Sequence, residues 1–470
     1  MSELPDDARL REALRTELPA PAHRPGFRDD VRTRVVTLAR PQGDKRGFWG
    51  SLKGRRLPLA AAAALAACAA AALVLFGLPG ATKQTGPAAA TAAQVAARMA
   101  VAMRSFTTLQ GQISTAVGRD LTPHPLGRVV ADSRGDFRID YEKVLPPEFD
   151  NASQPVARIF NASRHTLLDT WRDADGRLAG IEWAQCPPGA GFGDETYAGT
   201  MQPGLAWMVR AALADGDPGI VVKTATFEGR PAWSATFPQS GSFGFIDGAT
   251  VVVDQETGLV LQLKTTGDPD KDPSLNSGGP PPSVTTLSQI RVDPRVDGDT
   301  FSVTAPQEIQ LTVARGDYYC TLDQAAARVG YAPFLPSFVP EGFTLADVAT
   351  DPREFGPESP SDAAPGGGAH HELFLSFRHG FDAFSIKIAP LTAAEKRDAQ
   401  DRYAYLKQSP AYRSDVLRGG RFAEQTAQTW FDLNGANLLV LGDGYGALIS
   451  GSLTRQELLD VAGSLQQTQQ

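Results

Sequence analysis

Cysteine is scarce in this chain of 470 residues, which contains only three. Three cysteines are too few for a disulfide framework or for a zinc site made of four thiolates. The chain also lacks an excess of positive charge, since its formal net charge is −8. That balance argues against nucleic acid as the main partner. Apolar residues nevertheless make up 42% of the sequence, which is enough to build folded cores.

The sequence also lacks the short motifs of common enzymes. It has no Walker loop, no GxGxxG after a strand, no HExxH and no GxSxG. His370-His371-Glu372 is the only local cluster of metal-ligating types, and neighbouring residues on a strand point to opposite faces. We therefore expect no catalytic residue, no metal and no cofactor. A hydrolase with paired carboxylates is an alternative, because such pairs need no short motif.

Charge is absent from one long stretch near the N-terminus. No charged residue occurs from Leu57 to Thr82, and about 20 apolar residues suffice to cross a membrane as a helix. Residues 1–56 carry 13 Lys and Arg against 8 Asp and Glu, whereas the rest of the chain carries 32 against 45. The positive-inside rule then predicts a cytoplasmic arm (1–56), one inner-membrane helix (57–82) and an extracytoplasmic, periplasmic remainder.

Cys68 leaves a second interpretation of this stretch open. Leu65-Ala66-Ala67-Cys68 fits the lipobox of bacterial lipoproteins. Against that reading, the apolar run continues to Leu78, where a mature lipoprotein would already be polar. We favour a single-pass helix that contains Cys68 as a small apolar residue.

The arm itself shows two amphipathic patterns. Leu10, Leu14 and Leu18 recur every four residues, and a second pattern runs from Phe27 to Leu38 after a proline-rich break. Neither short helix can bury its apolar face alone. The arm is therefore either a docking segment for a cytosolic protein or a device that only sets membrane topology.

Beyond the membrane segment, the pattern predicts strands in two α+β units, at 90–315 and 320–470. Four Thr residues with Gln or Glu three positions later predict capped helix starts, namely Thr91, Thr321, Thr392 and Thr454. A further helix is expected over Pro203–Leu213. The strands expected in the first unit are Leu109–Val117, Phe137–Tyr141, Thr166–Trp171, Gly180–Trp183, Val221–Phe227, Pro231–Phe237, Ala249–Asp254, Leu259–Thr265, Val284–Val292 and Phe301–Val303. In the second unit they are Leu373–Arg378, Ala383–Ile388, Ala427–Asp432 and Asn437–Gly442.

Two of the expected helices in the first unit carry large, adaptable apolar side chains. Methionine adapts its shape and is frequent at promiscuous binding surfaces. The helices are therefore candidates to enclose an apolar ligand, although the same residues also suit an ordinary core. The candidate ligand-binding residues are Met99, Met103, Phe106, Trp207 and Met208. Cys186 and Cys320 form either a disulfide between the two units or two thiols.

Several stretches resemble one family. They are the helix over 91–106 with its continuation Phe106-Thr-Thr-Leu-Gln-Gly, then Phe227-Glu-Gly-Arg-Pro-Ala-Trp, and then Val251-Val-Val-Asp-Gln-Glu-Thr-Gly-Leu-Val-Leu-Gln. These resemble the lipoprotein-carrier (LolA) fold and its relatives of the RseB/MucB type. Pro336-Ser-Phe-Val-Pro-Glu-Gly-Phe-Thr-Leu is similar to the small C-terminal domain that the carriers lack.

The resemblance implies a fold and a mode of action. It implies an α+β protein with a curved antiparallel half-barrel, helices on its concave side, and a smaller α+β domain after it. It also implies a non-enzymatic envelope-stress regulator that binds an anti-sigma or sigma factor, or the acyl chains of lipids or lipoproteins. A membrane-tethered lipid or lipoprotein carrier is the alternative. This chain departs from the family in its predicted membrane helix and arm.

Overall fold

The computed structural model describes residues 90–468 with internal gaps. The gaps are 118–120, 143–153, 174, 186–202, 217–218, 239–247, 267–281, 304–308, 316–317, 352–371, 405–406, 408–410 and 433–434. The predicted arm, the predicted membrane helix, Cys68 and Cys186 lie outside the described residues. Within the residues that are described, no helix is both long enough and apolar enough to span a membrane.

The first sheet has twelve strands in the order β12-β6-β5-β4-β3-β2-β1-β11-β10-β9-β8-β7. All neighbours pair antiparallel except β12, which runs parallel to β6. The strands are β1 (Thr108–Val117), β2 (His124–Asp132), β3 (Phe137–Tyr141), β4 (Gln154–Asn161), β5 (Thr166–Arg172), β6 (Leu178–Ala184), β7 (Val221–Phe227), β8 (Arg230–Thr236), β9 (Thr250–Asp254), β10 (Val260–Thr265), β11 (Ser283–Val292) and β12 (Gln310–Arg315).

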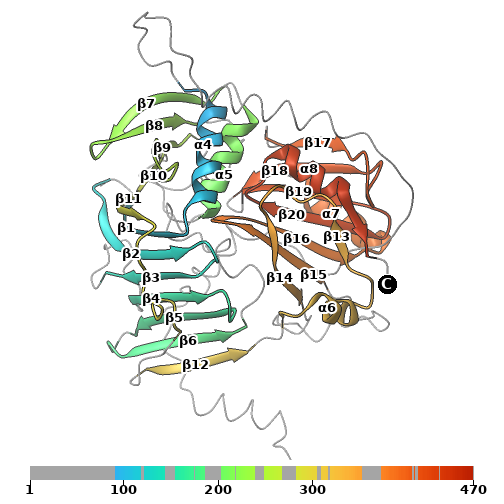
Figure 1. Ribbon diagram of the computed structural model, residues 1–470, viewed down its shortest axis with the longest axis horizontal. Coiled ribbons are helices and arrows are strands. Elements are labelled where there is room, and N and C mark those ends of the chain that lie inside the picture. The colour runs from blue at the N-terminus through green and yellow to red at the C-terminus, as the bar shows by residue number, and fades with distance from the viewer. Residues whose placement is uncertain are drawn as a thin grey trace, which may run out of the picture.

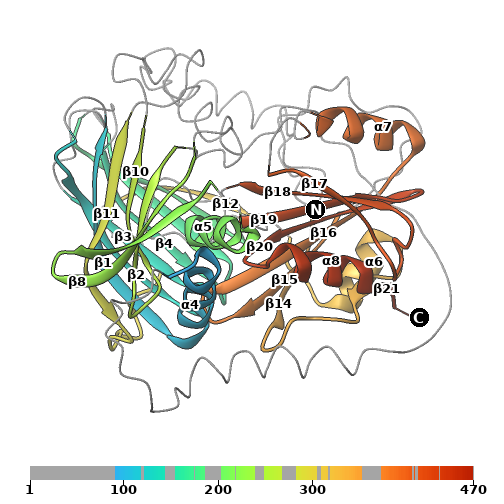
Figure 2. The same cartoon turned by 90° about the horizontal axis from the view of Figure 1, so that it is seen from above.

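This sheet is strongly curved, and two helices lie on its concave side (Figure 2). Register shifts interrupt the pairing of β1 with both of its neighbours, β11 and β2. Such bulges bend a strand and increase its twist. The helices are α4 (Ala92–Ser105) and α5 (Pro203–Asp215). The α+β half-barrel with helices on its concave side is therefore confirmed.

The second sheet has seven antiparallel strands in the order β14-β15-β16-β20-β19-β18-β17. They are β14 (Thr344–Asp351), β15 (Glu372–His379), β16 (Asp382–Pro390), β17 (Arg413–Val416), β18 (Thr426–Asp432), β19 (Gly435–Leu441) and β20 (Tyr445–Gly451). Its helices are α6 (Leu322–Val329), α7 (Ala393–Arg402) and α8 (Arg455–Ser464), and β13 (Phe334–Pro336) pairs with β21 (Leu465–Gln467). The helix pair α4–α5 lies between the two sheets (Figures 1 and 2).

The four predicted helix starts are confirmed in detail. Thr91, Thr321, Thr392 and Thr454 each accept a hydrogen bond from the backbone N–H three residues later. In each case the Gln or Glu at that position bonds back to the threonine N–H. Two otherwise unsatisfied donors are thereby paired at the start of each of these helices.

One predicted strand is wrong, and eight strands in the described part of the chain were not predicted. Phe301–Val303 is not a strand, because Thr300 and Ser302 donate backbone hydrogen bonds to Asp297 and Asp299 and so close turns. The strands without a prediction are β2, β4 and β12 in the first sheet and β13, β14, β17, β20 and β21 in the second unit. The strand β4 carries a proline and two polar residues at its ends, which hides its alternation.

Candidate functional site

The five predicted ligand-binding residues are all deeply buried. Met99, Met103, Phe106, Trp207 and Met208 are between 0% and 5% exposed and belong to one apolar cluster. They come from α4, α5 and the residue that ends α4. This cluster continues across the boundary between the first sheet, the helix pair and the second sheet. We call the part of it between the helix pair and the second sheet the seam.

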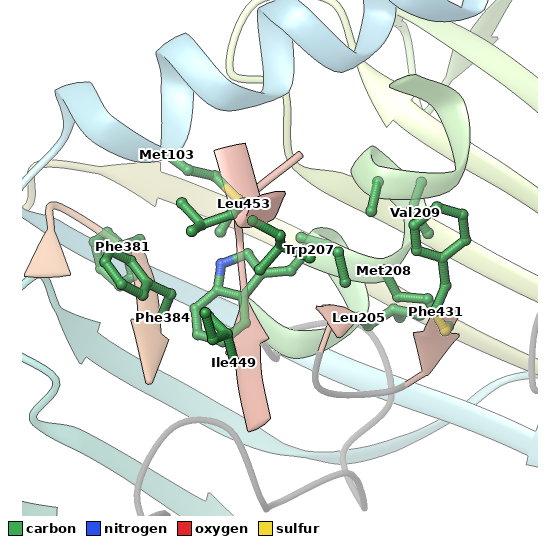
Figure 3. Close-up of a cluster of buried hydrophobic side chains, with 14 of the residues drawn as sticks. Met103, Leu205, Trp207, Met208, Val209, Phe381, Phe384, Phe431, Ile449 and Leu453 are labelled. Atoms are coloured by element: carbon green, nitrogen blue, oxygen red, sulfur yellow. The ribbon is translucent and has the colours of Figure 1, made fainter. Parts of the chain in front are cut away.

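Trp207 is the largest side chain that crosses the seam. It extends from α5 toward the second sheet, where Phe384, Ile449 and Leu453 surround it (Figure 3). Its indole N–H is buried and has no hydrogen-bond partner among the described residues. An unpaired buried donor costs about 1–3 kcal/mol. Trp207 therefore contributes much apolar contact and one unsatisfied polar group to the seam.

The C-terminal end of α4 is completed by the second sheet. Phe381, in the turn between β15 and β16, donates its backbone N–H to the Met103 carbonyl at 2.7 Å. That carbonyl is among the last in the helix, which lack partners inside it. Gly380 has φ +64°, and a Cβ there would lie 2.7 Å from the same oxygen. The Phe106 and Phe381 rings then pack with their centroids 5.0 Å apart.

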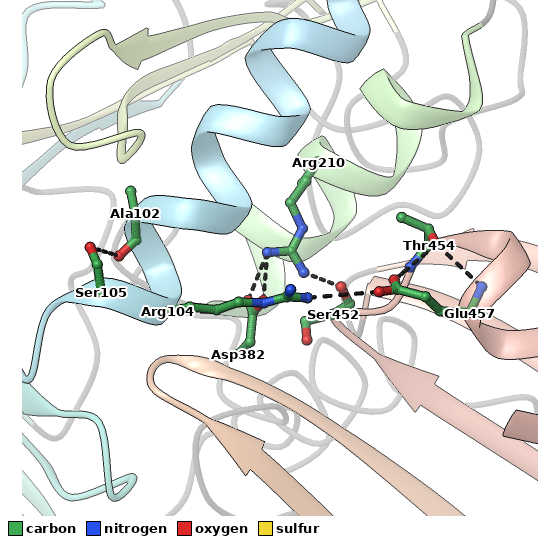
Figure 4. Close-up of polar contacts among 8 residues, drawn as sticks. All are labelled: Ala102, Arg104, Ser105, Arg210, Asp382, Ser452, Thr454 and Glu457. Carbon is green, nitrogen blue, oxygen red and sulfur yellow. Dashed lines mark hydrogen bonds and ion pairs between the residues drawn. The ribbon is translucent and has the colours of Figure 1, made fainter. Parts of the chain in front are cut away.

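A buried ion cluster lies next to these apolar contacts (Figure 4). Asp382, at the start of β16, is fully buried. Its carboxylate accepts from Arg210 Nη1 at 2.7 and 2.9 Å and from Arg104 Nε at 2.8 Å. Arg210 Nη2 also donates to the Ser452 carbonyl. One carboxylate of the second sheet thus pairs with an arginine from each helix of the pair.

Arg104 links this cluster to solvent. It is 25% exposed, and its guanidinium lies 5.2 Å from the centre of the Phe343 ring. Its Nη2 is 3.9 Å from Oε1 of Glu457, which is also the capping-box glutamate of α8. A second ionic contact joins the end of α5 to the second unit, because Asp215 lies 3.1 Å from Arg455 and 3.8 Å from Arg413.

The turn after β9 positions the other face of α4. Asp254 accepts from the backbone N–H groups of Glu256 and Thr257 and, at 2.6 Å, from Arg230. Burial alone would raise the pKa of Asp254, but these hydrogen bonds outweigh it and hold the pKa below its ordinary value. Gly258, at φ +69°, lets α4 approach, since a Cβ there would be 2.8 Å from the Met99 Cα.

The remaining predicted groups give no site within the described residues. No group of three or more His, Cys, Asp or Glu in that part of the chain is placed to hold a metal. His370 and His371 lie outside it. Cys320 is half-buried before α6, whereas Cys186 lies outside the described residues, so their pairing stays a prediction. The ion cluster was not predicted, because its members lie far apart in the sequence and form no motif.

No known family profile matches the sequence, and no curated protein does. Several solved structures are similar to this chain. One is MucB in complex with the periplasmic part of MucA, at 14% identity and TM-score 0.24, covering 81% of this chain and all of that one. Another is the MucA/MucB complex of Pseudomonas aeruginosa, at 15% identity and TM-score 0.24, covering 81% and 99%. A LolA-superfamily protein from Nitrosomonas europaea has 10% identity and TM-score 0.19, covering 46% and 98%.

Proposed function

We propose that this chain is a non-enzymatic, membrane-anchored envelope sensor that modulates sigma-factor signalling. Its extracytoplasmic units would bind an apolar ligand or a partner protein. The helix over 57–82 would anchor them, and the arm over 1–56 would engage a sigma or anti-sigma factor. The motifs that resemble the RseB/MucB type support this proposal.

One structural observation carries the proposal. The predicted ligand-binding side chains converge on the seam, where Met103, Phe106 and Trp207 contact the second unit or lie beside it. An acyl chain or an apolar peptide side chain that entered the seam would compete with contacts between the two units. Binding would then change how the units are held together, which is what a sensor requires.

A partner search tests the regulatory part of the proposal. The full chain is purified from native membranes in mild detergent, and co-purifying proteins are identified by mass spectrometry. The matched variant replaces Leu10, Leu14 and Leu18 with serine, which keeps every charge that sets topology. We expect a sigma or anti-sigma factor with the natural chain and its loss with the variant. Lipoproteins retained by both, without such a factor, would instead favour the tethered carrier.

Fluorescence quenching tests the ligand part. Full chain in detergent is mixed with a fatty acid brominated in its acyl chain, because bromine quenches nearby tryptophan. Trp207→Phe should remove most of the quenching, since Trp207 lies in the seam. Trp430→Phe is the matched control, because Trp430 packs in a separate cluster with Leu439 and Leu441. Equal quenching in both variants would contradict binding at the seam.

A further inference from the structure

The two units also meet at a second place, on β14 and β15 of the second sheet. His165 lies in the turn between β4 and β5 of the first sheet, and its ring stacks on that of Tyr319 just before α6. The ring centroids are 3.4 Å apart and the planes differ by 4°. On the same imidazole, Nε2 is 3.7 Å from the Asp347 carboxylate in β14. His165 is thus held between a ring and a carboxylate of the second unit.

The turn fixes the direction of this imidazole. His165 has φ +51°, a left-handed conformation that is uncommon for residues other than glycine. Its N–H donates to the Ala162 carbonyl at 3.2 Å, and the Arg164 N–H donates to the Asn161 side chain at 3.0 Å. Ala162 in turn donates its N–H to the buried Asp136 carboxylate at 2.6 Å. These bonds fix the backbone from which the imidazole extends toward the second sheet.

The charged groups around His165 compete for one carboxylate. Asp347 faces the imidazole from β14, and Arg378 in β15 lies 3.8 Å from the other oxygen of the same carboxylate. Both His165 and Asp347 are about four-fifths buried. A protonated imidazole would add a second cation next to Arg378 in a site with little water. Burial, the largest influence, and Arg378 lower the pKa of His165, and Asp347 only partly opposes them.

We propose that this contact is a pH-sensitive latch between the two units, which opens when His165 becomes protonated. The pKa of His165 is lower in the docked state than in the released state, so the released state binds the proton more tightly. Docking at this end is therefore fully stabilised above the ordinary histidine value of 6.5 and weakens as the pH falls below it. The proposal does not depend on which ligand or cytosolic partner the protein has.

Histidine exchange measured by mass spectrometry tests the latch on the full chain. Exchange of the imidazole C2 hydrogen gives the pKa of each histidine separately. We expect a pKa for His165 below the ordinary histidine value of 6.5. Exchange at His124, which is exposed at the start of β2, is measured alongside. Amide protection in the β4–β5 turn and in β14 should fall between pH 8 and pH 5. The fall should be about tenfold for each pH unit by which the pKa of His165 lies below the ordinary histidine value.

Two substitutions separate the latch from a general effect of acid. His165→Asn keeps a residue that tolerates the left-handed conformation but removes the titrating group. It should abolish the pH dependence of protection in the turn and in β14, whereas His124→Asn should leave it unchanged. Protection of α4 and β16 at the seam serves as the internal control. A His165 pKa at or above the ordinary value of 6.5, or the same pH dependence in His165→Asn, would overturn the latch.

Discussion

The seam and the latch join the same two units by opposite physical means. At the seam, Asp382 is fully buried and its carboxylate makes three charged hydrogen bonds within 2.9 Å. At the latch, His165 and Arg378 approach Asp347 only to 3.7 and 3.8 Å. Buried, fully paired charges cannot separate without large cost, whereas a histidine changes charge within the range of pH in which proteins stay folded. The comparison indicates that the charges at the seam do not respond to pH between 5 and 8, whereas those at the latch do.

The largest loss of stability should come from removing the carboxylate of Asp382 at the seam. Asp382→Ala leaves Arg210, which is almost fully buried, and Arg104 without their common partner. We expect a loss of about 3–5 kcal/mol in the free energy of unfolding, measured by urea denaturation. Asp443→Ala is the control, since it breaks a short ion pair with Lys396 in which Asp443 is exposed. The free energy of unfolding should be unchanged in Asp443→Ala. Equal losses in the two variants would mean that the burial of Asp382 does not make its ion pairs more important for stability than the exposed pair of Asp443.

Next in size should be the loss of the apolar anchor. Trp207→Ala removes a side chain that is 5% exposed and should cost about 3 kcal/mol. Trp207→Phe should cost much less, because it keeps most of the apolar contact and removes the unpaired N–H. Thermal unfolding of both variants gives the comparison. A phenylalanine variant as unstable as the alanine variant would show that the indole N–H makes an important bond.

The sequence could predict the parts of the fold that depend on near neighbours. The capping boxes at Thr91, Thr321, Thr392 and Thr454 were predictable because both partners lie three residues apart. Hairpin β15–β16 was predictable from alternation and a glycine turn. The ion cluster was not, because Asp382 lies 172 residues from Arg210 and 278 from Arg104. Only the packed fold brings these charges together.

An intermediate effect is expected at the turn that positions α4. Asp254→Asn weakens the bonds to Arg230 and to two backbone N–H groups, and should cost about 1–2 kcal/mol at pH 7. The folded pKa of Asp254 lies below the ordinary value of 3.8. Its contribution is therefore present above that value and is lost as the pH falls through the folded pKa. The difference between the natural chain and the variant should shrink below pH 3.8, and a constant difference would contradict the assignment.

The smallest effect at neutral pH should be that of His165→Asn, and its sign should change with pH. At pH 8 the variant loses the stack on Tyr319, so the free energy of unfolding should fall by less than about 1 kcal/mol. At pH 5 a protonated His165 beside Arg378 destabilises the natural chain, whereas the variant has no such cation. The variant should then be as stable as the natural chain or more stable. The effect of Asp382→Ala should not change sign with pH, because Arg104 and Arg210 stay charged throughout this range. If the free energy of unfolding changes with pH in the same way for His165→Asn and the natural chain between pH 8 and pH 5, the latch does not respond to pH. The distinction between it and the seam then fails.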